Sequence, residues 1–137
     1  MKKERLLALA DFLEKLPRKR FDFGDYIDTE GWDGEPLRVK VEGCGTAGCA
    51  IGWVPSVPAL KRAGAGVYGR EEPYHAFMAP VFTVGRKKFS DAELFAQTFF
   101  GLTFEEVHIL FVDGIEEPQK VTPKKVANRI RRLVAES

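Results

Sequence analysis

Apolar residues recur at helical spacing near both ends of the chain. Over residues 3–16 they fall at intervals of three and four, so they share one face of an amphipathic helix, made of Leu6, Leu9, Ala10, Leu13 and Leu16. Pro17 predicts the end of this helix, because the residue before a proline is pushed out of the helical conformation. Thr122 followed by Pro123 predicts the start of a final helix. The buried stripe of that helix is Val126, Ile130, Leu133 and Val134.

Two more helix starts stand in the last third of the chain. Ser90 followed three residues later by Glu93 is a capping box, and Gly101 predicts the end of the helix that it opens. Residues 103–106 repeat the capping pattern and predict a second helix that runs through Phe111.

Strand signals are weaker than helix signals. Residues 37–42 alternate apolar and polar side chains, which predicts a short strand with one buried face. Residues 80–84 favour a second short strand or an extended segment. We expect residues 18–36 to form an irregular loop that packs over the core through its aromatic side chains.

The segment between these strands is broken by proline and glycine. Ser56 is predicted to cap a short helix over residues 58–62, and Gly64, Gly66 and Gly69 predict a flexible turn. The predicted fold is therefore a helix-rich α+β fold, with about five helices and at most a small two-stranded sheet. The length of 137 residues predicts one compact domain over 1–137.

Composition excludes several classes of protein. Two cysteines exclude a disulfide-dense scaffold, and no apolar run approaches the roughly 20 residues that a membrane span needs. Charged residues interrupt the apolar stretch after Met1, so no secretory signal is predicted. We therefore expect a cytoplasmic protein with no membrane partner.

The net charge of +1 conceals blocks of opposite sign. The blocks 1–20, 21–37, 38–88, 89–118 and 119–137 carry +4, −6, +5, −7 and +5, which sum to +1. A nucleic-acid-binding domain more often has a pI above about 9, whereas the value here is about 7.8. Nucleic acid is therefore an unlikely partner, although the last block is a candidate basic surface, made of Lys120, Lys124, Lys125, Arg129, Arg131 and Arg132. We expect this basic helix to dock within the molecule or in a homodimer.

The densest chemical signal is the cysteine segment at residues 43–53. Gly43, Gly45 and Gly48 match a dinucleotide fingerprint, but Pro55 cuts the following helix short and no βαβ unit follows. A short helix is expected to begin near Thr46. If Thr46 caps this helix, the positive amino-terminal end of the helix would lower the pKa of a nearby cysteine thiol and make it reactive. The candidate thiol site is Cys44 and Cys49, and the candidate binding positions at the helix start are Gly45, Thr46 and Gly48.

The alternative is that both cysteines are small buried apolar residues, which is the reading that we favour. No metal is predicted. A zinc site would need two ligands besides the cysteines, and the available histidines, His75 and His108, have a spacing that matches no common zinc finger. The acidic residues within 28–34 do not have the spacing of a calcium-binding loop. No cofactor is predicted either. Both histidines are expected to be partly exposed side chains with their hydrogen bonds satisfied, and not catalytic residues or metal ligands.

The cysteine segment resembles a family of small uncharacterised bacterial and phage proteins with the motif Cys-Gly-Thr-x-x-Cys-x-x-Gly. The matching residues are Cys44, Gly45, Thr46, Cys49 and Gly52. The order of the flanking features is similar too: Pro17, Phe21 and Asp22 before the motif, and Phe100-Gly101-Leu102, Leu110-Phe111, Ala127, Arg129 and Ile130 after it. This family has no assigned activity, so the resemblance implies an order of elements and no function.

Five phenylalanines run through the two predicted helices of the last third: Phe95, Phe99, Phe100, Phe104 and Phe111. Acids, not Lys or Arg, lie among them, so they favour a core over a base-stacking surface. Aromatic side chains that the core cannot accommodate would be exposed, and such an exposed patch would mark a surface that binds a partner. We therefore expect a non-enzymatic accessory or interaction protein that binds a protein partner or itself. The alternatives are a thiol-dependent redox protein and a nucleic-acid binder that uses the basic last helix.

Overall fold

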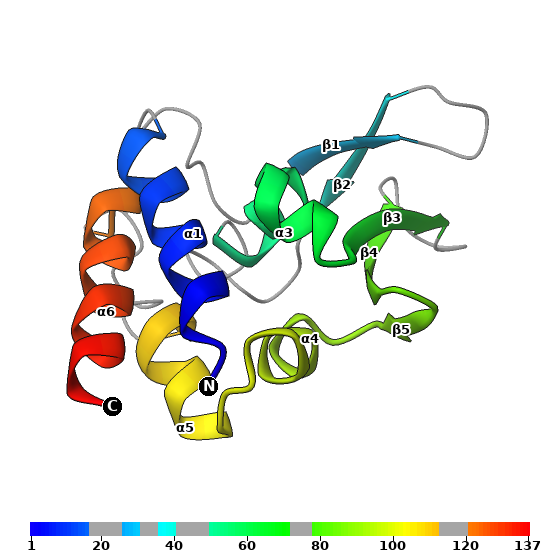
Figure 1. Cartoon of the computed structure of the whole chain (residues 1–137). Helices are drawn as coiled ribbons and strands as arrows, with labels where there is room; N and C mark the ends of the chain where they lie inside the picture. Colours follow the sequence, from blue (N-terminus) through cyan, green and yellow to red (C-terminus); the bar gives the residue numbers. More distant parts are fainter. Residues whose placement is uncertain (17–25, 31–35, 41–49, 72–77, 113–120) are drawn as a thin grey trace.

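The computed structural model describes residues 1–16, 26–30, 36–40, 50–71, 78–112 and 121–137. Its helices are α1 (Lys3–Lys15), α3 (Pro58–Arg62), α4 (Ala92–Phe100), α5 (Phe104–Val107) and α6 (Pro123–Glu136). A 3-10 turn, η2 (Val54–Ser56), follows a helical turn at residues 50–53, and a π-helical turn, η3 (His108–Val112), continues α5. Figure 1 shows α1 and α6 side by side, at the far side of the molecule from the sheet.

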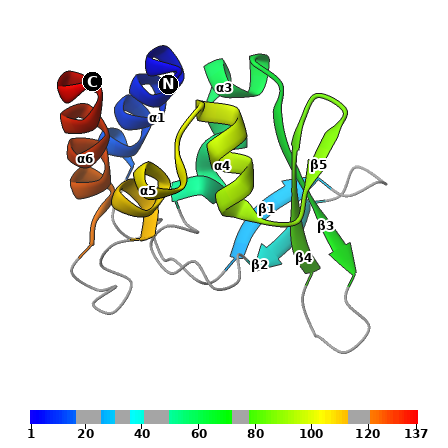
Figure 2. The ribbon, with the colours of Figure 1, turned by 90° about the horizontal axis from the view of Figure 1, so that it is seen from below.

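A sheet of five strands forms the other side of the molecule: β1 (Tyr26–Glu30), β2 (Pro36–Lys40), β3 (Ala65–Glu71), β4 (Met78–Val84) and β5 (Lys87–Phe89). The strand order is β1-β2-β4-β3, and β5 also pairs with β4. All pairs are antiparallel except β2 with β4. Viewed from below in Figure 2, α4 lies between this sheet and the α1–α6 pair.

The helix-rich α+β class is confirmed, but the sheet is larger than the predicted maximum of two strands. Residues 26–30 form a strand where an irregular loop was expected, and residues 65–71 form a strand where the glycines predicted a turn. Gly66 pairs with Thr83 of β4, and a Cβ at Gly66 would lie 2.5 Å from the Thr83 Oγ1. The glycine therefore permits a close cross-strand approach, and it does not break the strand.

The core is held together by a column of phenylalanine rings. The ring of Phe82 in β4 stacks on that of Phe95 in α4, with centroids 4.9 Å apart, and Phe95 stacks on Phe99 at 5.6 Å. The column continues through Phe100 at 5.1 Å to Phe111 of η3 at 6.3 Å. These five side chains are among the largest that are fully buried. The column therefore joins the sheet to α4 and α4 to η3.

The ends of the helices explain why these segments fold where they do. The α4 N-cap is Asp91 and not the predicted Ser90, because the Asp91 Oδ1 accepts from the backbone N–H groups of residues 93 and 94. Gly101 ends α4 with φ +66°, which favours glycine. The cap predicted at Ser56 is also absent, since Ser56 lies in the 3-10 turn and Val57 precedes α3 without a side-chain cap. The cap at Thr122 is confirmed, because its Oγ1 accepts from the Lys125 N–H.

Substitution of Phe95 tests the aromatic column. Phe95→Ala removes a ring that contacts Phe82, Phe89 and Phe99, so it should lower the free energy of unfolding by about 3–5 kcal/mol. Phe104 is the matched control, because it is 57% exposed, and Phe104→Ala should change stability by less than about 0.5 kcal/mol. Urea denaturation followed by circular dichroism measures both. Equal losses in the two variants would contradict the column.

Candidate functional site

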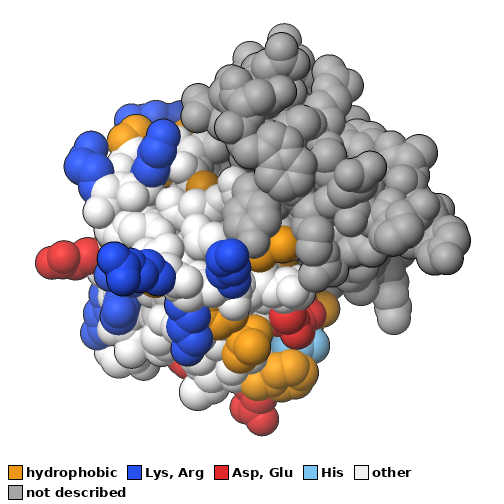
Figure 3. Space-filling model, turned by 90° about the vertical axis from the view of Figure 1, so that its right-hand side faces the viewer, with side chains coloured by type: hydrophobic (Ala, Val, Ile, Leu, Met, Phe, Trp, Pro, Cys, Tyr) orange, Lys and Arg blue, Asp and Glu red, His pale blue; other side chains and the backbone are white. Residues whose placement is uncertain are grey.

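Three large apolar side chains remain exposed on the helical segment that carries the aromatic column. Leu94 of α4 is 49% exposed, Phe104 of α5 is 57% exposed and Ile109 of η3 is 49% exposed. We call these three residues the α4–α5 face. In Figure 3 hydrophobic side chains gather at the lower edge of the molecule, next to acidic side chains and a histidine. The five-phenylalanine run therefore divides into four buried rings and one, Phe104, that stays outside the core.

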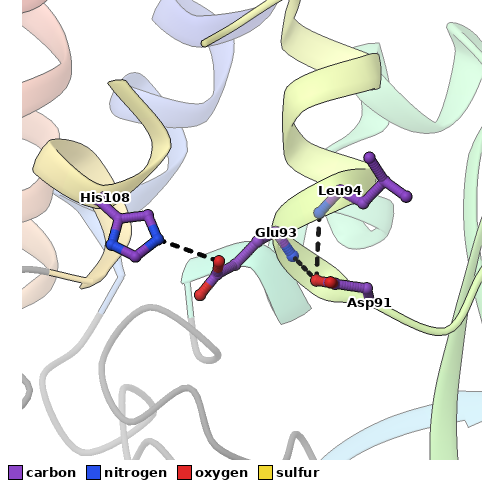
Figure 4. Close-up of polar contacts among 4 residues, drawn as sticks. All are labelled: Asp91, Glu93, Leu94 and His108. Carbon is purple, nitrogen blue, oxygen red and sulfur yellow. Dashed lines mark hydrogen bonds and ion pairs between the residues drawn. The ribbon is translucent and has the colours of Figure 1, made fainter. Parts of the chain in front are cut away.

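A contact between Glu93 and His108 connects the α4 part of this segment to the η3 part. The Glu93 side chain reaches from α4 to His108 at the start of η3, as Figure 4 shows, and the Glu93 Oε2 lies 3.1 Å from the His108 Nε2. Both side chains are one-third exposed. The His108 ring also packs on Phe104, with centroids 4.1 Å apart. His108 is thus a satisfied, partly exposed histidine, as predicted, and its partner comes from α4.

Two capped helix starts fix the position of these side chains. Asp91 holds the first turn of α4, as described above, and with it the backbone of Glu93 and Leu94. At α5 the predicted capping box is present, because the Thr103 N–H donates to the Glu106 Oε1 at 2.9 Å and the Glu106 N–H donates to the Thr103 Oγ1 at 3.1 Å. Phe104 is the first helical residue of α5 and lies within that box. Side-chain caps therefore hold the first turns of the two helices that carry the α4–α5 face.

The sequence of the segment that carries the α4–α5 face is acidic. Residues 89–112 contain four acids and neither Lys nor Arg; the acids are Asp91, Glu93, Glu105 and Glu106. Glu105 is exposed beside Phe104 in the first turn of α5. An apolar patch bordered by acidic residues favours a partner surface whose apolar side chains are flanked by Lys or Arg.

The sequence analysis expected Phe104 to lie in the core with the other four phenylalanines, which is wrong because Phe104 is the first residue of α5 and stays exposed. It did not single out Leu94 or Ile109. The exposure of Leu94 depends on which side of α4 faces the core, where Phe95, Ala96 and Phe99 are among the buried positions. Ile109 lies in the π-helical turn, which changes the angular spacing of the residues that a regular helix would have placed. Neither effect is visible in hydrophobicity alone.

The predicted basic surface of α6 is partly engaged inside the molecule. The Arg131 Nη2 donates to the Asp11 Oδ1 and to the Glu14 Oε2 of α1, each at 2.8 Å. The hydrogen bond with Asp11, followed by that with Glu14, raises the pKa of the Arg131 guanidinium above its ordinary value, so this arginine stays charged throughout the neutral range. Arg131 thus docks on α1.

The remaining candidates on this helix differ in exposure. Lys124, Lys125 and Arg132 are exposed and Arg129 is half-buried. Lys120 lies outside the described residues.

The cysteine segment also lies outside the described residues, so the predictions for Cys44, Cys49, Gly45, Thr46 and Gly48 stay predictions, as does that for His75. The helical turn that follows is described at residues 50–53. Its Ile51 is fully buried, and the ring of its half-buried Trp53 lies 5.8 Å from that of Phe12 in α1. Ile51 therefore belongs to the core, and Trp53 packs against the edge of the core.

No protein-family model, no curated protein and no solved structure matches this chain. Within the described ranges, no three His, Cys, Asp or Glu side chains gather in a way that could hold a metal ion. The helices of the same ranges include none with the length and apolar character to cross a membrane. The proposals below therefore rest on surface chemistry.

The Arg131 contacts predict a small, salt-sensitive contribution to stability. Arg131→Gln should lower the free energy of unfolding by about 0.5–1 kcal/mol at low salt, because the three side chains are partly exposed, and the loss should shrink in 1 M NaCl. Arg132→Gln removes the same charge from an exposed neighbour and should have no measurable effect. Denaturant titrations at two salt concentrations make the comparison. A salt-independent loss at Arg131 would show that packing, not charge, is responsible.

Proposed function

We propose that this protein is a non-enzymatic protein-interaction module and that the α4–α5 face is its binding surface. The observation that carries the proposal is the exposure of Leu94, Phe104 and Ile109 on one short segment, in which Glu93 bonds to His108 and the His108 ring packs on Phe104. Single exposed apolar side chains are common on protein surfaces. These three lie on one segment whose helix starts are capped and in which Glu93 bonds to His108. An exposed aromatic side chain on such a surface is a frequent source of binding energy.

The partner we propose presents apolar side chains flanked by Lys or Arg. The acidic rim at Glu93 and Glu105 attracts such a segment and repels an acidic one. A two-fold dimer through the same face would place these acids opposite their own copies, because a two-fold interface brings each patch against itself. The face therefore suits a different protein better than a second copy of this chain.

We further propose a cytoplasmic location and kinship with the Cys-Gly-Thr-x-x-Cys-x-x-Gly family. The motif at residues 44–52 and the order of the flanking elements support that kinship. The family has no assigned activity, so it adds no reaction to the proposal.

A synthetic peptide tests the proposed surface. The probe is a 16-residue helix-forming peptide with Leu on one face and Lys on the other, and its counterpart carries Glu in place of Lys. Isothermal titration calorimetry should show binding of the Leu/Lys peptide and none of the Leu/Glu peptide. Phe104→Ala should weaken the binding at least tenfold, since a central aromatic residue commonly contributes about 1–2 kcal/mol or more.

Leu7→Ala is the matched control, because Leu7 is an exposed apolar side chain of a different helix, α1. It should leave the affinity within about twofold of the unmodified protein. Equal weakening by Leu7→Ala and Phe104→Ala would contradict the proposal. Sedimentation that shows a dimer, which Phe104→Ala converts to a monomer, would replace the partner protein by a second copy.

A further inference from the structure

The last turn of α4 receives hydrogen bonds from the start of α1, a segment far away in the sequence. The final carbonyl groups of a helix have no partner within that helix. The Lys2 backbone N–H donates to the Phe100 carbonyl at 2.8 Å. The Arg5 Nη1 donates to the Phe99 carbonyl, also at 2.8 Å, across a separation of 94 positions. Residues 2–5 therefore supply donors that the end of α4 needs.

Arg5 contacts α4 in more than one way. Its guanidinium carbon lies 4.5 Å from the ring centroid of Phe99, so the positive charge also rests over this aromatic ring. A cation at the carboxyl end of a helix is favoured by the helix dipole, and a charged donor forms a stronger hydrogen bond than a neutral one. The Arg5 side chain is half-buried. Arg5 therefore holds both the backbone and a core ring of α4 at the point where this helix ends.

Residues 101–103 form the corner that connects this anchored turn to α5. A Cβ at Gly101 would lie 3.5 Å from the Met1 Cα, so the start of the chain packs on the corner. Leu102 is buried, and its N–H donates back into α4 at 3.0 Å. Thr103 is the N-cap of α5, and Phe104 is the first residue of that helix. Figures 1 and 2 both show the N-terminus beside the connection between α4 and α5.

We propose that Arg5 is a positioning residue for protein binding through the α4–α5 face, an inference that rests on the function proposed above. Leu94 lies in the first turn of α4, whereas Phe104 follows the corner, so one partner can contact both only at a fixed angle between the two helices. The Glu93–His108 contact holds this angle at the amino-terminal end of α4. Arg5 holds it at the carboxyl end.

The effect of Arg5 on binding follows from population shift. Without its contacts the corner samples other angles, and only the fraction of molecules with the original angle is competent to bind. The charge of Arg5 predicts the opposite effect, because removing a cation beside the acidic segment 89–112 would strengthen the attraction for a cationic partner. Weaker binding would therefore report a change in orientation and not in charge.

The first test is calorimetry with the Leu/Lys peptide described above. Arg5→Met keeps an apolar side chain and removes the guanidinium. Its dissociation constant should rise about fivefold, which corresponds to a competent orientation that is populated about one-fifth of the time. Arg5→Lys retains the charge and a donor, so it should recover most of the lost affinity. Circular dichroism verifies that each variant is folded.

Hydrogen exchange measured by NMR supplies a readout that needs no partner. The Leu102 amide should exchange about tenfold faster or more in Arg5→Met, because its hydrogen bond closes the corner and local opening exposes it. The Val126 amide, which donates to the Thr122 carbonyl at the start of α6, should keep its rate. Equal acceleration at both amides would indicate a general loss of stability and would overturn the inference.

Arg131→Gln is the matched control, because Arg131 also joins α1 to another helix through side-chain hydrogen bonds, but that helix is α6. It should leave both the peptide affinity and the Leu102 exchange rate unchanged. Unchanged affinity in Arg5→Met, or equal weakening by Arg131→Gln, would overturn the inference and leave the proposed function in place. Failure of the unmodified protein to bind the peptide would instead remove the proposed function, and the inference with it.

Discussion

Contact between phenylalanine rings is the constraint on which the rest of this structure depends. The ring of Phe95 lies between Phe82 of the sheet and Phe99 of its own helix, and the rings beyond it reach the π-helical turn. Because these rings are fully buried and interlocked, the sheet and the helical layer cannot shift independently. The α4–α5 face is attached to one end of this column.

The arrangement of charge follows from this framework. Cations of α6 are partly used inside the molecule, because Arg131 binds Asp11 and Glu14 of α1. The segment 89–112, in contrast, carries the exposed side chains Leu94, Phe104 and Ile109 together with four acids and neither Lys nor Arg.

Local signals predicted the helices well and the sheet poorly. The stripe of α1, the Thr103 box and the Thr122 cap are short-range patterns, and each appears in the structure where the sequence places it. The strand β3 was missed because its glycines suggest a turn, and only the pairing of Gly66 with Thr83 shows why a strand needs them. All five phenylalanines of the last third were predicted as core, and Phe104 is the exception, because its exposure depends on tertiary packing.

The central claim is that the apolar side chains left outside the phenylalanine column contact another protein. Replacing Phe104 by a photo-crosslinking phenylalanine analogue in the cells that naturally make this protein tests that claim most directly, with the same analogue at Leu7 for comparison. Mass spectrometry of the products should identify, from position 104 alone, a segment of a different protein that carries apolar side chains next to Lys or Arg. Identical products from positions 7 and 104, or a product that is a second copy of this chain, would contradict it.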